Sequence, residues 1–200
     1  GSGEIGMNMN LYAYGKENNQ KWIIVDMGVT FADDSIPGID LIFPDPGFIL
    51  DKKDDLLGIV LTHAHEDHIG AVAHIWPNLK CKMYATPFTA ALITEKFKEK
   101  KIDISPYLKI VPLNSKIKLG AFEIDFVTLT HSILEPNGLS ITTPLGTILH
   151  TGDWKIDPNP LIGGKIDEKK LKDIGDKGVS AMICDSTNIF SPGRAGSESD

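Results

Sequence analysis

A cluster of histidines and acidic residues at positions 63–68, His-Ala-His-Glu-Asp-His, carries the clearest chemistry in the chain. It holds three of the six histidines. Imidazole nitrogens and carboxylate oxygens are ligands that zinc and related divalent metals accept. Four such side chains are too many for one tight tetrahedral ion, so the spacing favours two neighbouring ions. His63 and His65 would bind one of them. Asp67 and His68 would bind the other.

The residues on either side predict how the cluster is held. Residues 57–62 are apolar and rich in β-branched side chains, which predicts a buried strand. In an extended exit from that strand, His63 and His65 point to the same side. Residues 69–73 predict a helix whose first turn contains the end of the cluster. A purely structural zinc site is the alternative, but such sites usually contain Cys, and no Cys stands near the cluster.

Two further candidate ligands, His131 and Asp153, each follow closely on a predicted strand. Functional side chains often lie on loops just past strand ends. We therefore expect His131 to complete the shell of the first ion, and Asp153 to bridge both ions through its two oxygens. Asp26 and Asp185 also stand at or near strand ends, where each could orient a ligand histidine. A role in a turn is the alternative for these two residues.

The rest of the chain alternates predicted strands and helices. The predicted strands cover residues 10–14, 21–26, 58–62, 82–85, 109–112, 116–119, 122–129, 139–143, 147–151 and 179–184. The predicted helices begin after His65, near residue 86 and at residue 168. Residues 27–55 carry many Asp, Pro and Gly and predict a long loop. Strands and helices interleaved in this way predict an α/β fold with two sheets and helices outside, a four-layer α/β/β/α sandwich.

Composition limits the class of protein. The 200 residues predict one domain or most of one, and a hydrophobic fraction of 42% is enough for a substantial core. The net charge of −7 argues against a free-standing nucleic-acid binder, which would normally be basic. No apolar run predicts a membrane span, and no signal peptide is present. Cys81 and Cys184 lack metal or redox spacing and predict small core residues in a cytoplasmic protein.

Six motifs together give the chain a resemblance to a known family. They lie at residues 3–8, 37–40 with 44–45, 61–70, 130–133, 150–157 and 185–188. In this order they resemble the metallo-β-lactamase superfamily and, within it, the ribonuclease J family of the β-CASP branch. The resemblance covers nearly the whole chain and implies the metallo-β-lactamase form of the sandwich.

The resemblance also implies a set of site residues. The ligands implied for one zinc ion are His63, His65, His131 and Asp153. Those implied for the other are Asp67, His68 and Asp153. Asp67 and Asp153 are the implied catalytic residues, and Mn²⁺ or Mg²⁺ are the alternatives to zinc. A separate structural Ca²⁺ is implied near Gly38 and Asp40, where the loop is rich in oxygen ligands.

The implied function is a zinc-dependent ribonuclease with 5′-to-3′ exonuclease and some endonuclease activity in RNA maturation and decay. Its expected substrate is single-stranded RNA with a 5′-monophosphate end, and the full-length protein is expected to be a homo-oligomer. The alternatives are a hydrolase of the same fold that acts on a small ester, thioester or lactone, a nuclease acting mainly on DNA or as an RNA 3′-end processor, and a non-catalytic RNA-binding scaffold with a structural metal.

The resemblance also implies that the chain is a piece of a longer protein. Residues 1–190 are expected to form the first, larger portion of the metallo-β-lactamase domain, and 191–200 a linker toward a β-CASP domain. In the family, a further histidine of the second zinc site comes from beyond this region. The 200 residues alone are therefore expected to be poorly active and to bind the second ion weakly.

Overall fold

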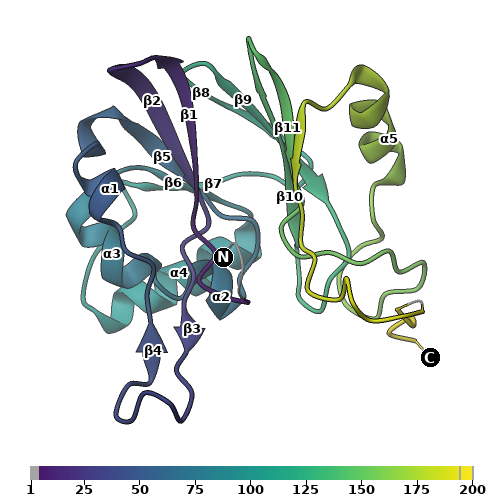
Figure 1. Cartoon of the computed structure of the whole chain (residues 1–200), viewed down its shortest axis with the longest axis horizontal. Coiled ribbons are helices and arrows are strands. Elements are labelled where there is room, and N and C mark those ends of the chain that lie inside the picture. The colour runs from purple at the N-terminus through teal and green to yellow at the C-terminus, as the bar shows by residue number, and fades with distance from the viewer. Residues whose placement is uncertain (1–4, 194, 200) are drawn as a thin grey trace. The chain divides into compact units, whose positions relative to one another are not determined.

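The computed structural model describes residues 5–193 and 195–199. It divides into two compact units, residues 1–111 and 112–200 (Figure 1). Each unit contains one five-stranded sheet. Of the motif at residues 3–8, Gly3 and Glu4 lie outside the described part of the chain.

The first unit is built on a mostly parallel sheet with the strand order β1-β2-β5-β6-β7. These strands are β1 (Asn10–Lys16), β2 (Asn19–Val25), β5 (Leu56–Val60), β6 (Met83–Ala85) and β7 (Leu108–Ile110). β1 pairs with β2 in antiparallel fashion, and the other neighbours are parallel. Val25 pairs with Val60, so β2 and β5 end together at one edge of the sheet. Residues that follow these two strands therefore emerge side by side.

Helices cover one face of this sheet (Figure 1). The helices of the unit are α1 (Gly47–Leu50), the 3₁₀ turn η1 (Lys53–Asp55), α2 (Glu66–Ile69), α3 (Val72–Leu79) and α4 (Pro87–Glu99). α3 and α4 meet through the rings of Trp76 and Phe97, whose centroids lie 5.3 Å apart. Both rings are buried. Ile93, one helical turn before Phe97 in α4, is fully buried as well. As expected for a helix start, Pro87 is the first residue of α4.

Two of the predicted loops in this unit differ from the structure. The connection between the predicted strands 10–14 and 21–26 is shorter than expected, because β1 continues to Lys16 and β2 begins at Asn19. Asn18 takes a left-handed φ of 68°, which permits a two-residue hairpin loop. The predicted long loop over 27–55 contains α1, η1 and a small hairpin of β3 (Thr30–Phe31) and β4 (Leu41–Ile42). These elements are too short to leave a periodic pattern in the sequence.

The second unit is built on a mostly antiparallel sheet with the order β12-β11-β10-β9-β8. Its strands are β8 (Lys116–Leu119), β9 (Phe122–Thr128), β10 (Asn137–Thr143), β11 (Gly146–His150) and β12 (Ala181–Ile183). Only the pair β11–β12 is parallel. Helix α5 (Glu168–Lys177) packs on this sheet, because Ile174 joins Val127 and Leu129 in one apolar cluster. Asp167 caps the helix by accepting the backbone N–H of Lys170 at 2.9 Å.

The cysteines differ from each other. Cys184 is exposed just after the edge strand β12, so its prediction as a core residue is wrong. Cys81 is half-buried, and burial raises the pKa of its thiol to about 12. Within the part of the chain that the structure describes, no helix has the length and apolar character needed to cross a membrane.

This difference predicts selective thiol labelling. Because the thiolate is the reactive form, a raised pKa and partial burial both slow the reaction of Cys81. At pH 7.5 we expect a thiol reagent such as iodoacetamide to modify Cys184 first, with Cys81 following more slowly. Peptide mass spectrometry over time measures both rates, and unfolding in urea is the control that should make Cys81 reactive. Equal rates in the folded protein would contradict the burial of Cys81.

Candidate metal centre

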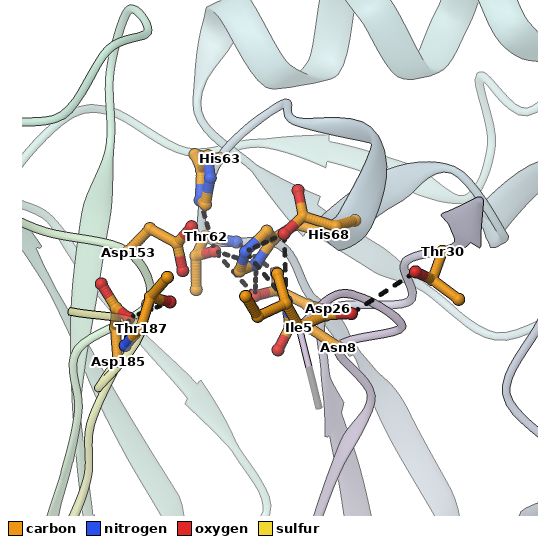
Figure 2. Close-up of polar contacts among 12 residues, drawn as sticks. Ile5, Asn8, Asp26, Thr30, Thr62, His63, His68, Asp153, Asp185 and Thr187 are labelled. Atoms are coloured by element: carbon orange, nitrogen blue, oxygen red, sulfur yellow. Dashed lines mark hydrogen bonds and ion pairs between the residues drawn. The ribbon is translucent and has the colours of Figure 1, made fainter. Parts of the chain in front are cut away.

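The first unit carries one half of the candidate site, and a buried aspartate organises it. Asp26 is fully buried and follows β2 in a left-handed conformation, with a φ of 61°. Its backbone N–H donates to the carbonyl of Val60 at 3.0 Å. Its Oδ1 accepts the backbone N–H of Thr62 at 2.8 Å, and its Oδ2 accepts the Thr62 hydroxyl at 2.7 Å (Figure 2). The end of β2 thus holds the first residues that follow β5.

The same carboxylate orients His68. The Nδ1 of His68 lies 2.7 Å from Oδ2 of Asp26, and both side chains are buried (Figure 2). Beside a carboxylate, Nδ1 carries a hydrogen and donates it, so Nε2 is the nitrogen left for a metal. The side-chain nitrogen of Asn8 lies 3.1 Å from that Nε2. His68 is therefore held in the tautomer that binds a metal through Nε2.

Thr62 extends this orientation to His63. The Thr62 hydroxyl oxygen lies 3.0 Å from Nδ1 of His63. Because the hydroxyl hydrogen is donated to Asp26, its oxygen accepts from Nδ1–H of His63. His63 then also keeps its lone pair on Nε2. One buried carboxylate thus fixes the tautomers of two histidines, one directly and one through a hydroxyl group.

The three histidine rings of this half-site lie close together. The ring centroid of His63 is 5.0 Å from that of His65 and 4.0 Å from that of His68. His63 offers ring nitrogens within 4.8 Å of a nitrogen of each neighbour. Imidazole nitrogens beside a carboxylate, that of Asp67, are the donors that zinc and similar divalent ions accept. The donor set of this half-site therefore suits the predicted metal.

Backbone hydrogen bonds hold helix α2, which carries Asp67 and His68, against residue 8 and the segment after β2. The N–H of Met27 donates to the carbonyl of His68 at 2.7 Å, and the N–H of Asn8 to that of Asp67 at 3.0 Å. Gly28 lies so close to α2 that a Cβ built on it would stand 1.6 Å from the carbonyl oxygen of Asp67. Only a residue without a side chain fits at this position.

The second unit carries two further candidate ligands, His131 and Asp153. His131 follows β9, and Asp153 follows β11. Nε2 of His131 lies 3.7 Å from Oδ2 of Asp153, and both side chains are partly exposed. The residue before His131, Thr130, forms an isolated β-bridge with Lys155. This bridge holds the two loops next to each other.

Three other predicted site residues lie in turns or loops. Oδ1 of Asp185 accepts the backbone N–H of Thr187 at 2.8 Å and its hydroxyl at 2.7 Å (Figure 2). The structure therefore shows a turn role for Asp185, and an additional role in orienting a histidine stays a prediction. Gly38 and Asp40 are exposed between β3 and β4, and Gly38 has a φ of 82°. Calcium binding there also stays a prediction.

Sequence reasoning missed three residues of the first half-site: Asn8, Gly28 and Thr62. Asn8 contacts two neighbouring candidate ligands. Its side-chain nitrogen lies 3.4 Å from Oδ2 of Asp67 and 3.1 Å from Nε2 of His68. Thr62 offered a signal, since it is the one hydroxyl residue between the apolar strand and the first histidine. The contacts of Asn8 and Gly28 join segments about 40 to 60 residues apart in the sequence, which no local pattern shows.

A Thr62→Val substitution tests the hydroxyl relay. Valine keeps the shape but removes the donor to Asp26 and the acceptor for His63. Because both groups are buried, we expect the free energy of unfolding to fall by about 1–3 kcal/mol. Urea denaturation measures this change. Thr94→Val is the matched control, since the Thr94 hydroxyl donates to the Ala90 carbonyl within α4 and its loss should cost less than about 0.5 kcal/mol.

Comparison with known proteins identifies the family. The Beta-lactamase superfamily domain matches residues 21–171, which contain every ligand predicted for the two ions. The chain belongs to the beta-lactamase superfamily. Ribonuclease J of Sinorhizobium meliloti is 45% identical to this chain over 200 residues, covering 99% of this chain and 35% of that protein. Ribonuclease J of Helicobacter pylori (strain 26695) is 40% identical over 200 residues, covering all of this chain and 28% of that protein.

These relatives confirm the predicted resemblance to ribonuclease J, and the chain spans about a third of their length. A crystal structure of a protein of unknown function from Enterococcus faecalis V583 has a fold similar to that of this chain. Its TM-score is 0.58 at 18% sequence identity, and the match covers 97% of this chain and 50% of that one. The predicted metallo-β-lactamase fold is therefore confirmed.

Proposed function

We propose that this chain forms the metal-binding part of a ribonuclease. The observation that carries the proposal is the relay from Asp26, which fixes the tautomers of His68 directly and of His63 through Thr62. With Nδ1 of each ring held by a carboxylate or a hydroxyl group, Nε2 is the nitrogen that each ring presents toward a metal. The relatives named Ribonuclease J support RNA as the substrate.

In this proposal the two half-sites supply ligands to the same ions. The ligands proposed for one ion are His63, His65, His131 and Asp153. Those proposed for the other are Asp67, His68 and Asp153. Zinc is the proposed metal, since nitrogen and carboxylate donors suit it, and Mn²⁺ or Mg²⁺ are the alternatives.

Bound divalent ions supply Lewis acidity and lower the pKa of water, so that a nucleophile exists at neutral pH. The residues of the chain do the positioning. Asp26 and Thr62 keep the two histidines in one orientation. Asp67, whose side chain is about one-third exposed, is the residue proposed to accept a proton from an attacking water. Asn8 stays within 3.4 Å of that carboxylate and restrains it.

The direction of cleavage, the RNA end and the cellular setting are proposed from the resemblance to ribonuclease J. We propose 5′-to-3′ exonuclease activity with some endonuclease activity, on single-stranded RNA with a 5′-monophosphate end. The proposed setting is RNA maturation and decay in the cytoplasm, in a homo-oligomeric full-length protein. Residues 191–200 are proposed to lead toward a β-CASP domain. Because the chain has a net charge of −7, bound cations would have to offset part of its repulsion for RNA phosphates.

The test is RNA cleavage by the full-length protein that contains this chain. The substrate is 5′-monophosphorylated RNA labelled at its 5′ end, with zinc or manganese, and a chelator is the control. We expect metal-dependent release of labelled mononucleotide as the main product. If the RNA stayed intact while a small ester or thioester was hydrolysed, the ribonuclease proposal would be wrong and a different hydrolase of this fold would replace it.

A further inference from the structure

Asp157, a buried carboxylate outside the proposed ligand set, forms hydrogen bonds with Ser197 and Glu198 and so joins them to the loop 155–161. Its side chain has no exposed surface. Oδ1 accepts the hydroxyl of Ser197 at 2.7 Å and the backbone N–H of Asn159 at 2.9 Å. Oδ2 accepts the backbone N–H of Glu198 at 2.8 Å and lies 3.4 Å from Nζ of Lys155. Four groups from two segments thus converge on one carboxylate.

These donors keep Asp157 charged. The N–H of Glu198, followed by the Ser197 hydroxyl, holds the pKa of the Asp157 carboxyl well below its usual range. The group is therefore ionised at neutral pH, and hydrogen bonds to an ionised acceptor are stronger than those to a neutral one. The segment 197–198 is thus held by a charged anchor as well as by contacts between its own residues.

The Glu198 side chain makes two further contacts with the loop 155–161. Its Oε1 lies 3.2 Å from Nζ of Lys155. Its Oε2 accepts the backbone N–H of Leu161 at 3.1 Å. Residues 197–198 therefore bind both ends of the loop 155–161, and we call these two residues the clamp.

The clamped loop is joined to the His131–Asp153 half-site. The N–H of Lys155 donates to the carbonyl of Thr130 at 3.0 Å, and the Thr130 hydroxyl donates back to the carbonyl of Lys155. His131 directly follows Thr130, and Asp153 stands two residues before Lys155. The bridge between Thr130 and Lys155 therefore sets how far apart the two proposed ligands lie.

We propose that the clamp, acting through Asp157 and Lys155, positions His131 and Asp153 for metal binding. Ser197 and Glu198 are then positioning residues, remote in sequence from the ligands they serve. The inference rests on the proposed function in one respect, the binding of metal by His131 and Asp153. The clamp itself rests on contacts within the second unit alone.

The first measurement needs no metal. In the metal-free chain, a Ser197→Ala/Glu198→Ala double variant is compared with wild type by hydrogen–deuterium exchange. The amide of Leu161 loses its acceptor and should exchange roughly fivefold faster in the variant, because a hydrogen bond worth about 1 kcal/mol corresponds to about fivefold. The amides of Lys155 and Asn159, whose loop loses contacts to the clamp, should also exchange faster. Amides in β9 should keep their wild-type rates. Unchanged exchange over 155–161 would overturn the clamp.

The second measurement is zinc affinity, from competition with a chromophoric chelator. We expect the double variant to bind zinc roughly 10-fold to 100-fold more weakly, the usual cost of losing a residue that supports a ligand. A Ser197→Thr variant, which keeps the hydroxyl, should bind as wild type does. Leu119→Ala is the control for general destabilisation, since Leu119 is buried and pairs with Phe122, at the end of β9 far from His131, and its loss should leave zinc affinity unchanged.

The outcomes separate the two proposals. Faster exchange with wild-type zinc affinity would overturn the positioning role and leave a clamp that serves folding alone. Equal weakening by Leu119→Ala would likewise overturn it. A wild-type chain that binds no zinc would contradict the proposed function and remove the positioning role with it, while the exchange result would still report on the clamp.

Discussion

Replacing His65 with alanine in the full-length protein is expected to abolish metal-dependent RNA cleavage, with a loss of roughly 10³-fold or more. His65 is only partly buried, and its ring centroid lies 5.0 Å from that of His63. The substitution should remove a proposed ligand and leave the Asp26 relay in place. We therefore expect the free energy of unfolding of the metal-free protein to change by less than about 1 kcal/mol.

A second histidine offers the control for this experiment. His74 is exposed on α3 and packs on Phe43, with ring centroids 4.7 Å apart. Its substitution by alanine should leave the cleavage rate at the wild-type level, measured with the same labelled RNA. Cleavage retained by the His65→Ala variant, or lost equally in both variants, would contradict the proposed ligand set.

Replacing Gly28 with alanine is expected to have the largest effect on stability. The new Cβ would stand 1.6 Å from the carbonyl oxygen of Asp67 and 2.6 Å from the backbone nitrogen of His68. Backbone atoms cannot move aside as a flexible side chain can, so helix α2 must shift. We expect a loss of about 3 kcal/mol or more in the free energy of unfolding, together with loss of zinc binding.

Gly175→Ala is the matched control for Gly28→Ala. Gly175 lies within α5, and a Cβ built there meets no atom within 4 Å. Because alanine favours a helix over glycine, this variant should be more stable by up to about 1 kcal/mol. Urea denaturation and zinc content measured on both variants would check the pair. A Gly28→Ala protein with wild-type stability would contradict the close approach of α2.

Three of the candidate ligands could be predicted from the sequence because each lies just after the end of a strand with a recognisable apolar pattern. His63 follows an apolar strand, and His131 and Asp153 follow strands at similar distances. The strand β5 ends two residues earlier than predicted, at Val60, since the N–H of Thr62 turns to Asp26 instead of a neighbouring strand. That turn depends on a contact between residues 36 apart. Local pattern alone could not show it.

Residues 191–200 are a second segment in which local sequence pattern does not show a long-range contact. Their Ser, Gly and Pro content predicts a linker, since such composition offers little apolar surface to bury. Ser197 and Glu198 are nevertheless fixed, by a carboxylate 40 residues earlier in the chain. Polar anchoring of this kind depends on which groups the fold brings together, and it leaves no periodic signal in the sequence.

The central claim is that ligands from both units hold the same ion. Zinc content per chain, measured by inductively coupled plasma mass spectrometry after gel filtration, tests it in wild type, His63→Ala, His131→Ala and the double variant. We expect each single substitution to remove the same ion, so that the double variant loses no more zinc than either single variant. Independent losses that add in the double variant, or a wild-type zinc content after His131→Ala, would contradict a shared site.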